Sequence, residues 1–120
     1  MSEIRNKEFL ILSKSKELLF DLDDILENVP RKDFYYKDKI KEYYNELIYS
    51  ILMINNLSGS NKAKNTYFSK IFTDVSLIDM YIERLYKKQY IAESTTKKII
   101  VKLTEINKMC SVWRKNSEES

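Results

Sequence analysis

The scarcity of proline and glycine constrains this chain more than any other feature of its sequence. Its 120 residues include one proline, Pro30, and one glycine, Gly59. Because these residue types are the strongest breakers of regular structure, the segments between them are too long for strands and have the lengths of helices. The chain is therefore expected to be almost entirely helical.

A third break, without glycine or proline, is predicted between Gln89 and Ser94. A polar helical segment ends near Tyr90, and the hydroxyls of Ser94, Thr95 and Thr96 suit the N-cap of a new helix. With these three breaks, the sequence predicts helices over residues 7–28, 34–57, 63–88 and 94–114. Residues 1–116 are expected to form one domain, followed by a frayed polar tail at 117–120.

Apolar residues recur at spacings of three and four in each predicted helix, which indicates one buried face per helix. The predicted core positions are Ile11, Leu12, Leu18, Leu19, Leu22, Ile25, Leu26 and Val29, then Ile40, Tyr44, Leu47, Ile51 and Ile54 with Tyr43, Ile48 and Leu52 widening the stripe, then Phe68, Ile71, Val75, Ile78, Ile82 and Leu85, and finally Ile99, Leu103, Ile106, Cys110 and Trp113 with Ile100 and Met109 flanking. Four such helices with short connections predict an all-α fold, an up-down-up-down antiparallel four-helix bundle.

Local signals refine the predicted helix ends and surfaces. Asp33 is a candidate N-cap for the second helix, and Gly59 supplies the left-handed conformation that commonly follows a helix. On the third helix, Asp74 is assigned to the exposed face together with Lys70 and Asp79.

The composition excludes most enzyme classes and favours a cytoplasmic protein. Charged residues make up 32% and hydrophobic residues 43% of the chain, which fits a globular protein. No apolar run reaches the ~18 residues that span a bilayer, and the polar N-terminus lacks the apolar stretch of a secretory signal. With no histidine, the commonest general acid–base and metal ligand are both missing. The chain is expected to be a non-enzyme with no cofactor and no membrane partner.

Two further groups of residues could suggest chemistry, and structural roles are favoured for both. The lone Cys110 lies within an apolar helical pattern and is expected to pack as a small hydrophobe. The acidic residues Asp21, Asp23, Asp24 and Glu27 could suggest a metal site, but Asp23 points away from the others on a helix. A solvated helix face is the better interpretation, and no metal site is predicted.

The charge is distributed unevenly along the chain. Residues 1–60 carry 9 Lys and Arg against 11 Asp and Glu, a net charge of −2, whereas residues 61–120 carry 12 against 7, a net charge of +5. In an up-down bundle the first and third turns lie at the same end, where they gather cationic side chains. The candidate nucleic-acid-binding residues at this end are Arg31, Lys32, Lys37, Arg84, Lys87, Lys88, Lys97 and Lys98.

Two interpretations of these cations stay open. They are ordinary solvated charges, or they bind phosphates or an acidic protein. Arg84, Lys87 and Lys88 are favourable partners for the negative end of the third helix dipole. Lys97 and Lys98 lie in the first turn of the fourth helix, whose dipole disfavours cations, so an external partner is the sharper explanation for them. Binding through phosphates would be salt-sensitive and weakly sequence-specific.

Aromatic residues supply the candidate oligomer interface, which consists of Trp113, Tyr49 and Tyr81. Tyrosines widen the apolar stripes, either because they lie at the edge of the core or because they form a self-association surface. Trp113 is the last apolar residue of its stripe, so it either closes the end of the core or anchors a partner.

Several segments resemble the Avd-like accessory proteins of diversity-generating retroelements, a four-helix bundle family that includes proteins encoded in 23S rRNA intervening sequences. The resemblance is carried by the last helix, residues 102–115 (KLTEINKMCSVWRK), by residues 25–32 (ILENVPRK), by Ile40 with Leu47 and Ile48, and by residues 88–90 (KQY). Ser111 and Val112 stand where the family often has paired glycines, and the Ser-Ile-Pro-type segment of the intervening-sequence branch is absent. The Avd-like branch is therefore favoured.

The resemblance implies a homopentamer with a basic surface that binds a reverse transcriptase and RNA or DNA during mutagenic copying, and it implies no catalytic residues. The sequence thus predicts a non-catalytic oligomeric accessory or scaffold protein that binds nucleic acid and a reverse transcriptase. The alternative is a helical protein–protein interaction or self-assembly module without a nucleic-acid role.

Overall fold

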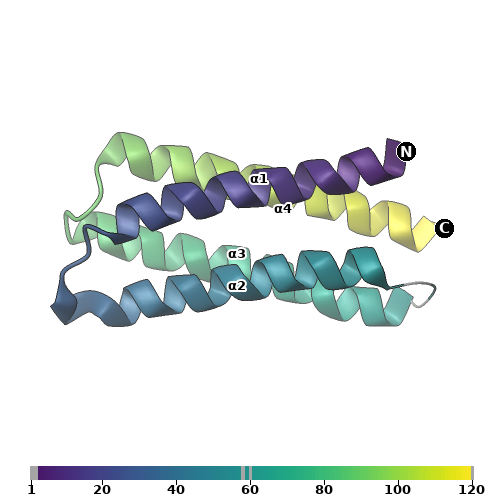
Figure 1. Ribbon diagram of the computed structural model, residues 1–120, viewed down its shortest axis with the longest axis horizontal. Coiled ribbons are helices and arrows are strands. Elements are labelled where there is room, and N and C mark those ends of the chain that lie inside the picture. Colours follow the sequence, from purple (N-terminus) through teal and green to yellow (C-terminus); the bar gives the residue numbers. More distant parts are fainter. Residues whose placement is uncertain (1–2, 58, 60, 120) are drawn as a thin grey trace.

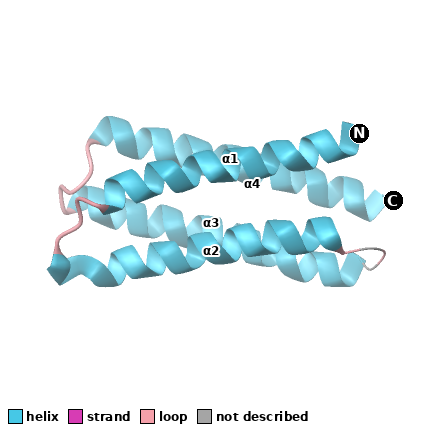
Figure 2. Ribbon diagram, in the orientation of Figure 1, coloured by secondary structure: helices cyan, strands magenta, loops and turns pink. Residues whose placement is uncertain are grey.

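The structure, a computed structural model, describes residues 3–57, 59 and 61–119, and among these the side chains of 10–57, 59 and 61–117. Four long helices, α1 (Glu3–Leu26), α2 (Phe34–Asn56), α3 (Asn61–Lys87) and α4 (Glu93–Glu119), are accompanied by a short 3-10 helix, η1 (Arg31–Asp33), ahead of α2. The described part of the chain contains no strand (Figure 2). None of its helices has the continuous apolar length that a membrane-spanning segment requires.

The helices form an elongated antiparallel bundle of 46 × 22 × 18 Å. Helix α1 packs against α2 and α4, and α3 packs against the same two helices, so each helix contacts its neighbours in chain order and α1 closes the ring against α4. Figure 1 shows both termini at one end with the α2–α3 connection, while the other two connections lie at the opposite end. The predicted up-down-up-down four-helix bundle is confirmed.

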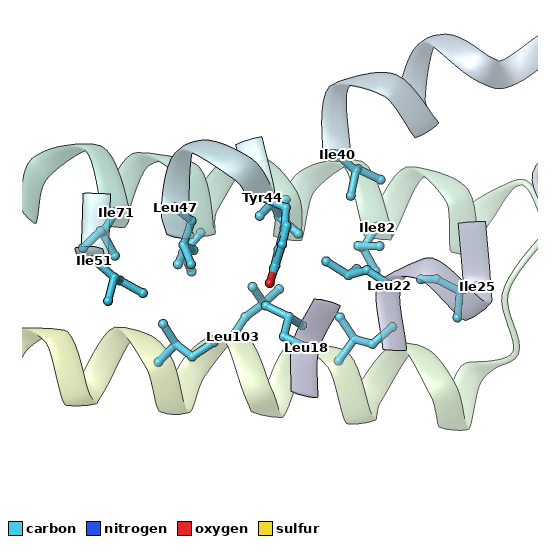
Figure 3. Close-up of a cluster of buried hydrophobic side chains, with 14 of the residues drawn as sticks. Leu18, Leu22, Ile25, Ile40, Tyr44, Leu47, Ile51, Ile71, Ile82 and Leu103 are labelled. Carbon is cyan, nitrogen blue, oxygen red and sulfur yellow. The ribbon is translucent and has the colours of Figure 1, made fainter. Parts of the chain in front are cut away.

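The bundle core is made of the predicted apolar stripes. Buried residues from all four helices converge between them, as Figure 3 shows for Leu18, Leu47 and Leu103. Phe68, Ile78 and Ile106 are completely inaccessible to solvent. Trp113 is only partly buried and packs against the core from its edge. Burial of about 25 cal/mol per Å² of apolar surface makes this core the main source of stability.

A buried hydrogen bond joins α1 to α2 within the core. The Tyr44 hydroxyl donates to the main-chain carbonyl of Ser15 at 3.0 Å, and Figure 3 shows this hydroxyl pointing from α2 towards α1. The Ser15 hydroxyl in turn donates to the Ile11 carbonyl at 2.9 Å. Burial, followed by the charge of Asp23, raises the pKa of Tyr44 to about 12, so its proton stays in place to make this bond.

The helix boundaries differ from the predicted ones by a few residues. Helix α1 ends at Leu26 because the amides of Asn28 and Val29 bond to the Ile25 and Leu26 carbonyls, each at 3.2 Å, in a tighter turn before Pro30. Helix α4 continues to Glu119, through most of the predicted frayed tail, because no glycine or proline interrupts it. Ser120 lies outside the described residues.

The predicted N-cap position of α2 is confirmed but without a capping bond, and the predicted N-cap of α4 is wrong. Asp33 precedes α2, but its side chain makes no capping bond and turns instead towards the α3–α4 connection. Helix α4 begins at Glu93, so Ser94, Thr95 and Thr96 fall inside its first turn, where the Thr96 hydroxyl donates to the Ala92 carbonyl at 2.9 Å.

Two residues with positive φ mark the turns. Gly59 has φ +90°, as the sequence predicts, between Ser58 and Ser60, which lie outside the described residues. Gln89, with φ +69°, ends α3 without a glycine. The Tyr90 amide bonds to the Leu85 carbonyl at 3.1 Å and the Gln89 amide to the Tyr86 carbonyl at 2.8 Å, which is the Schellman arrangement that closes helix C-termini.

The assignment of Asp74 to the exposed face is wrong. Its side chain is 2% exposed and faces α2, and Oδ2 has no hydrogen-bond partner. Burial, followed by the nearby charge of Glu46 on α2, raises the pKa of Asp74 to about 7. A carboxyl group in such a place is most stable in its neutral form.

Candidate nucleic-acid interface

The predicted cations lie at the bundle end formed by η1 and the α3–α4 connection (Figure 1). We call this region the basic end and define it by the eight predicted residues, Arg31, Lys32, Lys37, Arg84, Lys87, Lys88, Lys97 and Lys98. A polar contact fixes the geometry of this end, because the Lys88 ammonium donates to both carboxylate oxygens of Asp33, at 3.2 and 3.3 Å. The Tyr90 hydroxyl donates to the same carboxylate.

This contact takes Lys88 out of the set of available cations. Asp33 is only 8% exposed, and its pKa is lowered, chiefly by the hydrogen bond from Tyr90 and further by Lys88, against the opposing effect of burial. The same Tyr90 hydrogen bond raises the pKa of the tyrosine. The Lys88 ammonium also lies 5.7 Å from the centre of the Tyr36 ring. Lys88 therefore holds η1 against the α3–α4 connection.

Three other predicted cations have local partners. Lys87 pairs with Glu83 at 3.2 Å and Lys97 with Glu93 at 3.3 Å, both one helical turn away. The ammonium of Lys37 lies 4.8 Å from the centre of the Phe34 ring. The pair with Glu93 offsets the helix-dipole penalty at Lys97, so that residue needs no external partner to explain it.

The remaining four cations, Arg31, Lys32, Arg84 and Lys98, are exposed, and none has an ion-pair partner among the residues that the structure describes. The eight cations share this end of the bundle with seven acids, Asp23, Asp24, Glu27, Asp33, Asp38, Glu83 and Glu93, which leaves 8 − 7 = +1. Exposed cations without partners keep their charge available for an anionic ligand at no cost in broken ion pairs.

Beyond the predicted Lys98, two exposed cations that the sequence prediction did not include, Lys108 and Lys115, lie further along α4. Lys108 and Lys115, seven residues apart, share the face of α4 that points away from the core, and the exposed Lys98 lies about a quarter turn around the helix from them. We call these three residues the α4 ridge. At 1.5 Å per residue the ridge is about 26 Å long. The position of Lys108 and Lys115 opposite Ile99 and Ile106 on the helix is the sequence signal that could have identified them.

Acidic residues that flank the α4 ridge are neutralised by neighbouring helices. Glu105 pairs with Lys14 of α1 at 3.6 Å, and Asp21 of α1 pairs with Lys102. Both contacts lie between α1 and α4, so they stabilise that interface and leave the outer face of α4 without a free acid in the described part of the chain.

The three candidate interface aromatics occupy different environments. Trp113 meets the Phe68 ring edge-on, with ring centres 5.3 Å apart, which fits its interpretation as the closing residue of the core. Tyr81 is half-buried between α2 and α3 and stacks on Tyr43 with ring centres 5.8 Å apart. Tyr49 is 55% exposed and touches Tyr67 edge-on. Tyr49 is thus the one of these three with most of its surface free.

The structure also exposes apolar side chains that the sequence prediction did not single out. Those exposed by half or more are Leu10, Phe20, Tyr35, Met80, Val101 and Val112, besides Tyr49. Tyr35 lies at the basic end, one helical turn from Asp38 and close after Arg31 and Lys32. Its position could not be deduced from periodicity, since it depends on how α2 rotates against α3.

The described residues include no group of three or more potential metal ligands. Cys110 is fully buried, and burial raises the pKa of its thiol to about 12, so the thiol stays protonated and acts as a packing group. Comparison of the chain with protein-family models, curated proteins and solved structures gives no match. The resemblance to Avd-like proteins therefore stays a prediction from the residues quoted above.

Proposed function

We propose that this protein is a non-catalytic, oligomeric accessory protein that binds nucleic acid through the phosphate backbone. The observation that carries the proposal is the set of exposed cations without ion-pair partners, which starts at the basic end with Arg31, Lys32 and Arg84 and continues along the α4 ridge. Clustered Lys and Arg on one surface are the electrostatic signature of backbone binding.

The rigid geometry of the basic end supports this function. The bond between Asp33 and Lys88 fixes η1, which carries Arg31 and Lys32, against the α3–α4 connection. Cations held on a fixed scaffold lose less conformational entropy on binding than cations on a loose loop. The contact surface is a helix face and two turns, so we expect it to track phosphates and not base edges.

The resemblance to Avd-like proteins extends the proposal to a homopentamer and to a reverse transcriptase as protein partner. In this accessory role, the protein would bind the nucleic acid and the reverse transcriptase at the same time during mutagenic copying. The expected genomic setting is a reverse-transcriptase gene and a near-duplicate template repeat beside the gene for this protein.

A second candidate function is self-assembly or protein binding without nucleic acid. The exposed Phe20, Val101 and Val112 favour it, because large apolar side chains in solvent often mark interfaces. Phe20 on α1 is distinct from the cations of η1 and α3, whereas Val101 and Val112 share α4 with Lys108 and Lys115, so substitutions in η1 and α3 separate the two functions most cleanly.

Fluorescence anisotropy with a labelled RNA hairpin and a labelled DNA duplex separates the two functions. We expect binding at about 50 mM salt that weakens at least tenfold at about 200 mM. No binding to either probe at the lower salt would exclude the first function. Light scattering at the same concentration should give a multiple of the 14.4 kDa chain mass, and a monomer would contradict both the oligomeric accessory protein and self-assembly.

A further inference from the structure

Tyr35 is both the most exposed of the described aromatic residues at the basic end and in contact with two other rings. It is 60% exposed, and it is braced by other rings from below. Its ring meets Tyr36 edge-on, with centres 5.7 Å apart and planes at 81°, and Tyr81 of α3 with centres 6.5 Å apart and planes at 68°. Tyr81 is itself stacked on Tyr43.

These contacts hold Tyr35 in place while most of its surface stays in water. The neighbouring Tyr81 side chain is also the main reason that the pKa of Tyr35 is raised. An exposed aromatic ring on a folded scaffold normally loses area to a neighbour or adopts several rotamers. A ring that is fixed yet uncovered is preorganised to receive a flat partner.

The charges around Tyr35 indicate the chemistry of that partner. The Lys39 ammonium lies 5.8 Å from the centre of its ring, and Arg31 and Lys32 precede it by one turn. Arg84 follows Tyr81 by three residues on α3 and is exposed. Of the nearby acids on α2, Glu42 is paired with Lys39 at 3.2 Å, and Asp38 is exposed. The balance around the ring is positive.

We propose that Tyr35 is a stacking platform for an unpaired base and that the basic end consequently prefers single-stranded nucleic acid over a duplex. The proposal rests on the proposed function and names its substrate class. Bases of a duplex are already stacked on each other, whereas a single strand presents base faces to an aromatic ring and phosphates to the flanking cations. An acidic peptide would use the cations but would gain little from a free ring.

The test compares substitutions at two matched tyrosines. Tyr49 is the control, because it lies on the same helix, is 55% exposed and also meets a tyrosine of α3 edge-on, but at the far end of α2. Binding of a labelled oligo(dT) strand of about 15 nucleotides and of a duplex of similar length is measured at about 50 mM salt. Circular dichroism melting and sedimentation accompany each variant.

We expect Tyr35→Ala to weaken oligo(dT) binding about tenfold and to leave duplex binding within about twofold. Tyr35→Phe should keep oligo(dT) binding, since stacking needs the ring and not the hydroxyl. Tyr49→Ala, when it sediments at the wild-type mass, should change the binding of neither probe. If Tyr35→Ala leaves oligo(dT) binding intact while the wild-type protein binds both probes, the stacking proposal is wrong and the proposed function survives.

Two other outcomes also overturn the proposal. A Tyr35→Ala protein that binds oligo(dT) normally but sediments at a lower mass would make this face a contact between copies of the chain. A wild-type protein that binds neither probe would exclude the proposed function and the stacking platform together.

Discussion

Lys88, one residue beyond α3, and Asp33, in η1, are 55 residues apart in sequence and are joined by two hydrogen bonds of 3.2 and 3.3 Å. Asp33 is nearly buried, so its charge depends on this partner and on Tyr90. The contact joins the α3–α4 connection, which has no glycine, to η1, which follows Pro30. The two turns therefore form one surface.

Replacing Lys88 with methionine should lower Tm by several degrees, because it leaves the Asp33 carboxylate nearly buried without its cation. The double variant Asp33→Asn with Lys88→Met should recover part of the loss. Lys87→Met is the matched control, since the exposed pair of Lys87 with Glu83 contributes no more than about 0.5 kcal/mol. Equal Tm values for Lys87→Met and Lys88→Met would show that the Asp33 contact is not stabilising.

The same contact should be sensitive to acid. The pKa of Asp33 is lowered from its ordinary value of 3.8, so its contribution to stability is present above that pH and is lost as the pH falls through the lower, folded-state pKa. The difference in urea unfolding between the wild type and Lys88→Met should therefore be full at pH 6 and should shrink as the pH falls below about 3.8. A difference that stays constant over this range would contradict the role assigned to Asp33.

Asp74 should have the opposite pH dependence. Its pKa is raised from 3.8 to about 7, so its favourable contribution is full below pH 3.8 and is lost as the pH rises through about 7. Between about pH 5 and pH 8 this one group should reduce the free energy of unfolding by about 2 to 3 kcal/mol. Asp74→Asn should remove this loss and be the more stable protein at pH 8. Asp79→Asn, on the same helix and more exposed, is the control, and an identical pH profile for Asp74→Asn and the wild type would contradict the burial of a neutral carboxyl.

Gln89 occupies a backbone conformation that suits glycine. With φ +69°, it closes α3 at a cost of about 1 kcal/mol relative to glycine. Gln89→Gly should raise the free energy of unfolding by about that amount. Gly59→Ala should lower the free energy of unfolding by a similar amount. Gly59 has φ +90° and nothing lies within 4 Å of the added methyl, so this loss would come from backbone strain alone. Chemical denaturation measures both, and a destabilised Gln89→Gly would show that the Gln89 side chain contributes more than its backbone costs.

Trp113→Ala should reduce the free energy of unfolding by about 3 kcal/mol, because it removes the edge-on contact with Phe68 at the end of the core. Trp113→Phe should recover most of the loss. Sedimentation separates this role from the interface interpretation. A Trp113→Ala protein that keeps its Tm but dissociates would identify Trp113 as a contact between subunits.

The helices and their buried faces could be predicted because both follow from local patterns. Breakers at Pro30 and Gly59 set the helix lengths, and the spacing of residues such as Ile71, Val75 and Ile78 sets which face turns inward. Antiparallel order then follows from short connections, so the shared end of the first and third turns was also predictable.

The roles of individual polar residues could not be predicted in the same way. The burial of Asp74 and the partner of Asp33 depend on how α2 and the α3–α4 connection rotate against each other, and periodicity carries no information on this. The spacing of Glu93 and Lys97 allows an ion pair, but the sequence does not show whether Lys97 forms that pair or stays free. Which cations stay available thus became clear only from the contacts between helices.

The salt dependence of nucleic-acid binding tests the central claim most directly. The observed binding constant is measured against salt for the wild type, for a triple variant of unpaired cations (Arg31→Gln, Lys32→Gln and Lys98→Gln) and for a control that neutralises three exposed lysines elsewhere (Lys16→Gln, Lys41→Gln and Lys62→Gln). Each phosphate contact contributes a slope of about −0.7 to −0.9. We predict that the triple variant lowers the magnitude of the slope by about 2 to 3 while the control, with the same net charge, keeps the wild-type slope. Equal slopes for the two variants would contradict the claim that the basic end binds the phosphate backbone.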